Sequence, residues 1–140
     1  MHIAIMADDK KKELLAQFCI AYCGILCKHE LCATSITGKY VSDATGLKIE
    51  KFLPGSHGGG QQILSRIAYD EIDMLIYMRD PDAYQSLEEK EVKDNLLRLC
   101  DIHNVPVATN LATAEVLING LERGDLAWRE IVNPNYSRRY

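Results

Sequence analysis

Short apolar runs recur along the chain, and a segment with helical spacing follows each of them. HIAIMA (residues 2–7) and MLIYM (residues 74–78) are the clearest, and residues 30–34, 49–53 and 105–109 are three further runs. Strands that are apolar at nearly every position are buried on both faces, which is typical of parallel sheets covered by helices. Five such strands alternating with helices, without a long linker, predict a doubly wound α/β fold, a five-stranded parallel sheet with helices on both faces.

The expected helices fill the intervals between these strands. Apolar residues at helical spacing predict a helix from residue 10 to about residue 28, with Asp8 and Asp9 as its caps. A shorter helix over residues 38–45 should end at Gly46, because glycine readily adopts the left-handed conformation that ends a helix. Three further helices are expected at residues 61–69, 88–103 and 113–123.

The size and charge of the chain exclude several classes of protein. Its 140 residues fit one domain, which we expect to span residues 1–132, followed by a polar tail at residues 133–140. A net charge of −4 provides no basic surplus for a nucleic-acid partner. No apolar run is long enough to cross a membrane, and nothing after Met1 resembles a signal peptide. We therefore expect a cytoplasmic protein that binds neither nucleic acid nor membrane.

The five cysteines are odd in number and form no CxxC pair, which favours a reducing compartment over a disulfide framework. Cys19, Cys23 and Cys27 recur every four residues and would share one stripe of a helix. Small apolar residues lining a core are the favoured interpretation of this stripe. A metal or redox site is the alternative.

Ligands of doubly wound sheets bind at the carboxyl ends of the strands. The stretch LPGSHGGGQQ (residues 53–62) follows one such end and contains four glycines but no acidic side chain. Bare amides at the start of a helix favour an anion, and Lys12 lies one turn into the first helix. The sequence therefore predicts a pocket of phosphate size. The segments expected to surround it are residues 7–9, 34–38, 54–60, 79–81 and 109–110.

Taken together and in this order, these segments resemble the methylglyoxal synthase family. The resemblance implies a homohexamer that uses no metal and no organic cofactor. It also implies a reaction that converts dihydroxyacetone phosphate into methylglyoxal and inorganic phosphate. Such a reaction needs a base for a carbon-bound proton beside the carbonyl, and donors for the phosphate and the developing charges. The stretches that carry the resemblance are HIAIMADDKKK, LCATSITGKYVSDATGL, LPGSHGGGQQI, IYMRDPD, LLRLCDIHNVPVATNLATAE and LERGDLAW.

Most of the phosphate-binding positions that the resemblance implies are retained in this chain. Lys12 matches the lysine that contacts the phosphate, and Gly55 matches a glycine of the second phosphate loop. The other retained positions are Thr34, Thr37 and Gly38 in the first phosphate loop, Gly58, Gly59, Gln61 and Gln62 beyond the second, and Asp9, Asp80 and Pro81 elsewhere.

The main differences from the family pattern fall at the positions of its catalytic groups. Gly60 occupies the position of the base aspartate, Asp8 replaces one histidine, and a second histidine position falls at Leu87. Losing a positioned base typically costs ~10²–10⁴ in rate, whereas each lost charge-assisted contact to phosphate costs roughly 1.5–3 kcal/mol. We therefore expect proton abstraction to suffer more than anion binding. Three further substitutions lie in the phosphate loops, at Ser35, Ile36 and Pro54.

Four charged or titratable residues near this site have two interpretations each. His57 is a candidate base but also an ordinary solvated loop histidine. Asp8 is a candidate replacement for the missing aspartate or a helix cap, and Asp80 a site residue or a turn former. Lys12 is a phosphate ligand or a solvated helix lysine. Two functions stay open: a weak or rearranged lyase, and a non-catalytic binding or regulatory module for phosphate or a small phosphorylated metabolite.

Overall fold

The computed structural model describes residues 1–132, and its strands form one parallel sheet in the order β3-β2-β1-β4-β5. The chain winds from β1 outward to β3 and then returns to the other side of β1 to form β4. The predicted doubly wound, five-stranded parallel sheet is therefore confirmed. The strands are β1 (His2–Ala7), β2 (Glu30–Ala33), β3 (Ile49–Lys51), β4 (Met74–Met78) and β5 (Val107–Ala108).

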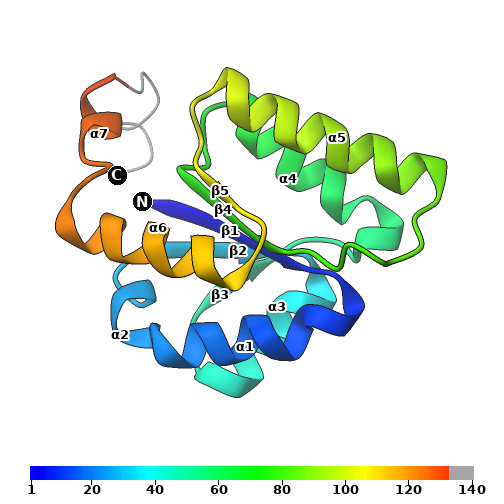
Figure 1. Cartoon of the computed structure of the whole chain (residues 1–140), viewed down its shortest axis with the longest axis horizontal. Coiled ribbons are helices and arrows are strands. Elements are labelled where there is room, and N and C mark those ends of the chain that lie inside the picture. The colour runs from blue at the N-terminus through cyan, green and yellow to red at the C-terminus, as the bar shows by residue number, and fades with distance from the viewer. Residues whose placement is uncertain (133–140) are drawn as a thin grey trace.

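Helices cover both faces of this sheet (Figure 1). On one face lie α1 (Lys12–Ala21), α3 (Ser35–Thr45) and α6 (Leu111–Arg123), and on the other lie α4 (Gly59–Ala68) and α5 (Leu87–Ile102). This division puts the helices that follow β1 and β4 on opposite faces. The shorter elements are the 3-10 helices η1 (Asp9–Lys11) and η2 (Gly55–His57) and the α-helices α2 (Cys23–Leu26) and α7 (Trp128–Val132).

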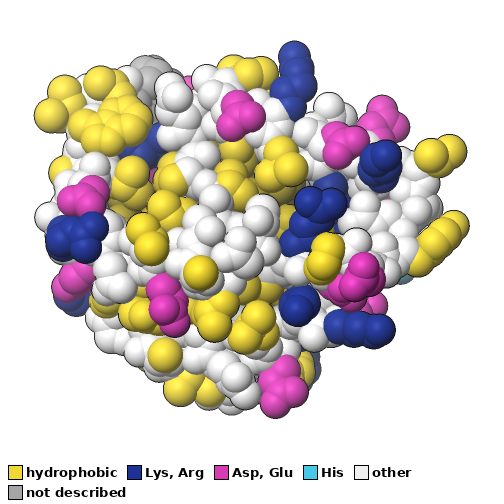
Figure 2. All heavy atoms as spheres, in the orientation of Figure 1, with side chains coloured by type: hydrophobic (Ala, Val, Ile, Leu, Met, Phe, Trp, Pro, Cys, Tyr) yellow, Lys and Arg dark blue, Asp and Glu magenta, His cyan; other side chains and the backbone are white. Residues whose placement is uncertain are grey.

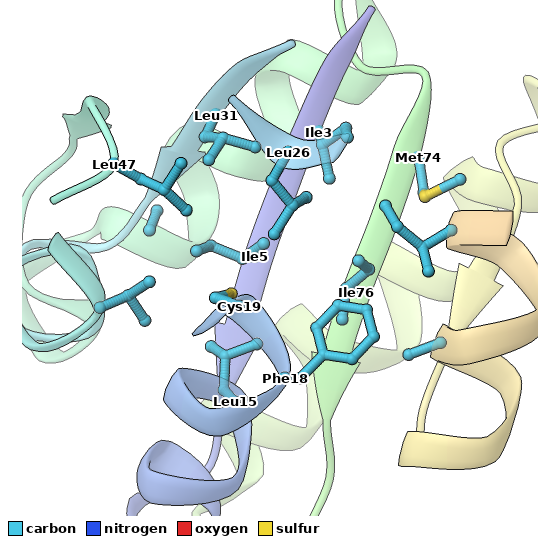
Figure 3. Packing of buried hydrophobic residues seen from close by; sticks show 14 of the residues in the cluster. Ile3, Ile5, Leu15, Phe18, Cys19, Leu26, Leu31, Leu47, Met74 and Ile76 are labelled. Atoms are coloured by element: carbon cyan, nitrogen blue, oxygen red, sulfur yellow. The ribbon is translucent and has the colours of Figure 1, made fainter. Parts of the chain in front are cut away.

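Two apolar layers hold the helices to the sheet. Ile5 and Ile76 of the sheet lie in one layer with Phe18 of α1 (Figure 3). Side chains of a strand alternate between faces, so Leu75 of β4 belongs to the opposite layer with Ile63 of α4. Burial on both faces explains why β4 is apolar at all its positions.

The structure corrects several predicted boundaries. The predicted helix 10–28 is interrupted at Tyr22 and divides into α1 and α2. The third helix begins at Ser35 rather than at residue 38, which places Thr37 and Gly38 inside α3 instead of in a loop. β3 and β5 are shorter than predicted, and α7 was not predicted at all. The predicted capping role of Asp8 is also wrong, because its side chain makes no capping hydrogen bond.

The cysteine stripe follows the apolar interpretation only in part. Cys19 is buried and Cys23 is half-buried in the layer beneath α1, but Cys27 is exposed because the helix is interrupted at Tyr22. Within residues 1–132, no group of three His, Cys, Asp or Glu side chains is placed to hold a metal ion. Over the same residues, no helix is long and apolar enough to span a bilayer. The predicted tail at residues 133–140 lies outside the described part of the chain.

Candidate functional site

The site is built around the carboxyl ends of β1 and β4, which are neighbours in the sheet. Ala7 pairs with Met78 at the ends of these strands, and the Asp8 amide donates a hydrogen bond to the Met78 carbonyl at 3.1 Å. The helices that follow the two strands cover opposite faces, so this is the topological switch point where doubly wound sheets bind their ligands. Asp8 lies directly at that point.

The starts of α3 and α4 meet beside this switch point. The Ser35 amide, in the first turn of α3, donates to the Leu53 carbonyl at 3.4 Å. A Cβ atom added to Gly59, the first residue of α4, would overlap the same carbonyl oxygen and lie 2.9 Å from Thr34 Cγ2. Gly59 is therefore required for the contact that brings the two helix starts together. The Gln62 side chain fixes the connecting loop by accepting a hydrogen bond from the Leu53 amide at 2.8 Å.

Neither of these helix starts is capped by a side chain. The cap residues Thr34 of α3 and Gly58 of α4 make no side-chain cap bond, and neither first turn contains an acidic residue. By contrast, Ser86 caps α5 and Asn110 caps α6, through side-chain oxygens 3.2 and 3.0 Å from first-turn amides. First-turn amides without a cap, together with the positive end of the helix dipole, favour an external anion. We refer to this pair of uncapped helix starts as the anion cradle, a candidate site for an anion.

Lys12 is held near the end of β1 by a neighbouring carboxylate. Its ammonium lies 2.7 Å from Asp9 Oδ1, and the Lys12 side chain is 17% exposed whereas that of Asp9 is 100% exposed. The solvated-lysine interpretation is therefore wrong for Lys12. Because the Asp9 carboxylate is fully exposed to solvent, this ion pair contributes little stability and Asp9 can be displaced by an incoming anion.

Asp8 is the hub of a hydrogen-bond network. Its Oδ1 atom accepts from the Tyr77 hydroxyl at 2.6 Å and from Lys93 Nζ at 3.1 Å. Its Oδ2 atom accepts from the Asp80 amide at 2.7 Å. Burial raises the pKa of Asp8, but these donors outweigh burial and hold it below its ordinary value of 3.8. Asp8 is therefore ionised at neutral pH and a weak base.

This network makes stability depend on pH in the acid range. A carboxyl whose pKa is lowered by folding contributes stability that is present above pH 3.8 and is lost as the pH falls through the lower, folded-state pKa. Asp8→Asn is expected to remove that component, so wild type and variant should converge in unfolding free energy as the pH falls. Urea unfolding at a series of pH values measures this. Tyr77→Phe, which removes one donor, should move the loss to higher pH, and a constant difference at every pH would contradict the assignment.

Gly60, the second residue of α4, carries no group that could act as a base. It is half-buried, and a Cβ atom added there would lie 3.3 Å from Val92 Cγ1 of α5. A side chain at this position would need only a small shift of Val92. The glycine is therefore not required by packing in the way that Gly59 is.

The remaining predicted site residues differ in their exposure to solvent. His57 ends η2 and is exposed, and Leu87 begins α5 with 87% of its surface exposed. Asp80 acts as a turn former, because its Oδ1 accepts from the Asp82 amide at 3.0 Å. Ile36 is 62% exposed in the first turn of α3. Along the two loops, Thr37 and Gly38 are buried within α3, Ser35 and Pro54 are half-buried, and Gly55 is exposed.

Sequence reasoning missed Tyr77 and Lys93. The available signal was a tyrosine within an otherwise aliphatic strand, since a buried tyrosine hydroxyl generally finds a hydrogen-bond partner. Lys93 gave no such signal, because its contact with Asp8 spans 85 positions of the sequence.

This chain is similar to known proteins over nearly its whole length. The MGS-like domain family matches residues 16–109. A methylglyoxal synthase from Caldicellulosiruptor saccharolyticus is 59% identical over 138 residues, which are 99% of this chain and 96% of that protein. This chain belongs to the methylglyoxal synthase family. The resemblance predicted from the sequence motifs is thereby confirmed.

Further members of the methylglyoxal synthase family support the assignment. A methylglyoxal synthase from a Geobacillus species is 52% identical over 132 residues, covering 94% of this chain and 93% of that protein. The crystal structure of the methylglyoxal synthase from Elizabethkingia anophelis superposes with a TM-score of 0.76 at 37% identity. That match covers 84% of this chain and 76% of the other. Membership of the methylglyoxal synthase family therefore extends to the fold as well as the sequence.

Proposed function

We propose that this family member binds a small phosphorylated metabolite at the carboxyl edge of its sheet and eliminates phosphate from dihydroxyacetone phosphate only slowly. The observation that carries this proposal is the contrast between the two parts of the site. The helix starts that form the anion cradle, those of α3 and α4, have no side-chain cap and no acidic residue in the first turn. The position where the resemblance implies a base holds Gly60, which has no side chain.

In the proposed reaction, the phosphate of dihydroxyacetone phosphate lies against the ammonium of Lys12 and the first-turn amides that follow Ser35 in α3 and Gly59 in α4. The amides of Ser35 and Gly59 themselves donate to backbone carbonyls. Removal of a proton beside the carbonyl gives an ene-diolate, which expels the phosphate by breaking the carbon–oxygen bond and leaves the enol of methylglyoxal. The enol then regains a proton on carbon to give methylglyoxal. The cradle stabilises the departing phosphate through fixed donors. The proton-transfer step has no carboxylate at Gly60, and Asp8 is a weak base because its oxygens accept three hydrogen bonds.

A second candidate function is a non-catalytic binding or regulatory module for phosphate or a phosphorylated metabolite. The same observations favour it, since the cradle needs no base in order to bind. Incubating the pure protein with dihydroxyacetone phosphate, and following the release of phosphate and methylglyoxal, distinguishes the two functions. Slow release supports the weak lyase, and binding without release supports the module. A rate equal to that of relatives with an aspartate would contradict both. Self-association into a homohexamer and a cytoplasmic location remain part of the proposal.

The phosphate-binding role of Lys12 gives a direct prediction. Lys12→Met is expected to weaken binding of inorganic phosphate by roughly 10- to 100-fold, because a charge-assisted hydrogen bond to the anion is lost. Isothermal titration calorimetry measures the change. Lys10→Met is the matched control, since Lys10 is an exposed neighbour of the same charge. Equal losses in the two variants would show a general charge effect and contradict a direct contact.

A further inference from the structure

A second ammonium group is fixed at the same edge of the sheet as the cradle. Lys93 projects from α5 so that its Nζ atom lies 3.1 Å from Asp8 Oδ1 and 5.5 Å from the centroid of the Tyr77 ring. The Lys93 side chain is only 22% exposed. A long, flexible side chain held by two partners in a largely buried place has a defined position, unlike most surface lysines.

The carboxylate that holds Lys93 is itself immobilised. Asp8 accepts the Tyr77 hydroxyl on the oxygen that also binds Lys93, and the Asp80 amide on the other oxygen. An ammonium group has three donors, and only one of them is directed at Asp8. The network therefore presents a fixed cation with donors available to a further acceptor.

Lys93 also lies at the same edge of the sheet as the other parts of the site, because its partner Asp8 follows β1 directly. Asp8 and Asp9 are consecutive residues, so Lys93 on Asp8 and Lys12 on Asp9 place two ammonium groups on neighbouring carboxylates. The residue before Lys93 is Val92, whose Cγ1 atom lies 3.3 Å from the position of a Cβ atom on Gly60. α5, the helix that carries Lys93, therefore packs against the first turn of α4, which is part of the cradle.

We propose that Lys93 donates a hydrogen bond to a carbonyl or carboxylate oxygen of the ligand, while the cradle and Lys12 hold its phosphate. This inference rests on the proposed function and specifies the class of ligand. The site would prefer small phosphorylated compounds with an acceptor oxygen near the phosphate over simple alkyl phosphates. During elimination, Lys93 would keep its proton and stabilise the negative charge that develops on the carbonyl oxygen.

The test compares two phosphate esters that differ only in the group farthest from the phosphate, with inorganic phosphate as a third ligand. 2-Phosphoglycolate carries a carboxylate where ethyl phosphate carries a methyl group. Lys93→Met is expected to weaken 2-phosphoglycolate binding by roughly 10- to 100-fold, and to leave ethyl phosphate and inorganic phosphate within about twofold of wild type. Lys90→Met, an exposed lysine on the same helix, should change none of the three affinities.

The outcomes separate this inference from the proposed function. Equal weakening of all three ligands by Lys93→Met, or no weakening at all, would overturn the role of Lys93 while leaving the cradle intact. Failure of the wild-type protein to bind any of the three would overturn the proposed function itself. Lys93→Arg, which keeps the charge and the donors, should retain most of the preference for 2-phosphoglycolate. If Lys93→Met does not fold, Lys93→Gln keeps a donor toward Asp8 and should show the same selective loss.

Discussion

Replacing Gly60 by aspartate is expected to raise the rate of methylglyoxal formation from dihydroxyacetone phosphate by about 10²–10⁴-fold, the typical contribution of a positioned general base. The gain follows because the substitution places a carboxylate beside the anion cradle, where the wild-type chain has no side chain. In the proposed function, the starts of α3 and α4 and the ammonium of Lys12 hold the phosphate without any change to the wild-type chain. The measurement is the turnover number with saturating substrate, assayed through both products.

The fold accommodates an aspartate at position 60. The added Cβ atom would lie 3.3 Å from Val92 Cγ1, so the valine side chain must move by a few tenths of an ångström. The position is in the first turn of α4, where a negative side chain interacts favourably with the helix dipole. We therefore expect little change in the unfolding temperature.

Gly60→Asn is the matched control, because asparagine has the size of aspartate but cannot act as a base. Turnover that rises in the aspartate variant and stays at the wild-type level in the asparagine variant would assign the gain to proton abstraction. Equal rates in both variants would show that the missing carboxylate does not limit the reaction. In that case the altered positions Ser35, Ile36 and Leu87 become the leading explanation for slow turnover.

The sheet could be predicted from sequence because burial on both faces leaves a strong pattern. The apolar run at residues 74–78 is β4 in full, and the run at residues 2–7 is β1 in full. The predicted start of α3 is three residues late, because glycine is unfavourable inside a helix and Gly38 was therefore placed at its boundary. Thr34 is a residue type that commonly precedes a helix and indicates the observed start. β5 was overestimated because apolar residues at 105–109 continue beyond the two residues that pair in the sheet.

The site was predictable to the extent that topology determines it. The carboxyl ends of parallel strands meet at one edge, so Asp8 and the glycine-rich loop had to lie near each other. The partners of Asp8 were not predictable, because Tyr77 and Lys93 are far from it in sequence and act through particular side-chain conformations. The absence of side-chain caps on α3 and α4 could not be predicted, because it depends on the residue at which each helix begins.

Arg129, at the opposite end of the sheet, is another residue whose contacts could not be predicted from the sequence. It lies on α7, a helix of five residues that is too short to be stable alone. Hydrophobic side chains over α7 face outward (Figure 2), and Ile131 is 86% exposed. Arg129, however, is 3% exposed, and its Nε atom lies 3.3 Å from a carboxylate oxygen of Asp73, which is fully buried. Buried arginine is rare, and nothing in the sequence marks this one.

The guanidinium of Arg129 joins α7 to two segments of the chain, residues 72–73 and residues 103–104. Besides Asp73, it donates to the carbonyl of Ile72 at 3.4 Å, to that of His103 at 3.5 Å and to that of Asn104. The planar guanidinium has five donors in a fixed arrangement and can satisfy several acceptors at once. A lysine ammonium, a compact charge on a flexible side chain, could not make the same set of contacts. Arg129 thus attaches α7 to the segments that lead into β4 and β5.

Arg129→Met is expected to lower the free energy of unfolding by about 3–5 kcal/mol, because Asp73 then keeps a buried negative charge without its guanidinium. Chemical denaturation at neutral pH measures the loss. Adding Asp73→Asn in the same chain removes that charge and should recover part of the stability, whereas Arg129→Lys should stay well below wild type because it loses the carbonyl contacts. If Arg129→Met cost less than about 1 kcal/mol, the range of a surface ion pair, the pair would not be what secures α7. The buried Asp73 carboxylate would then have to be stabilised by its other contacts, which include the hydrogen bond from the His2 amide at 2.9 Å.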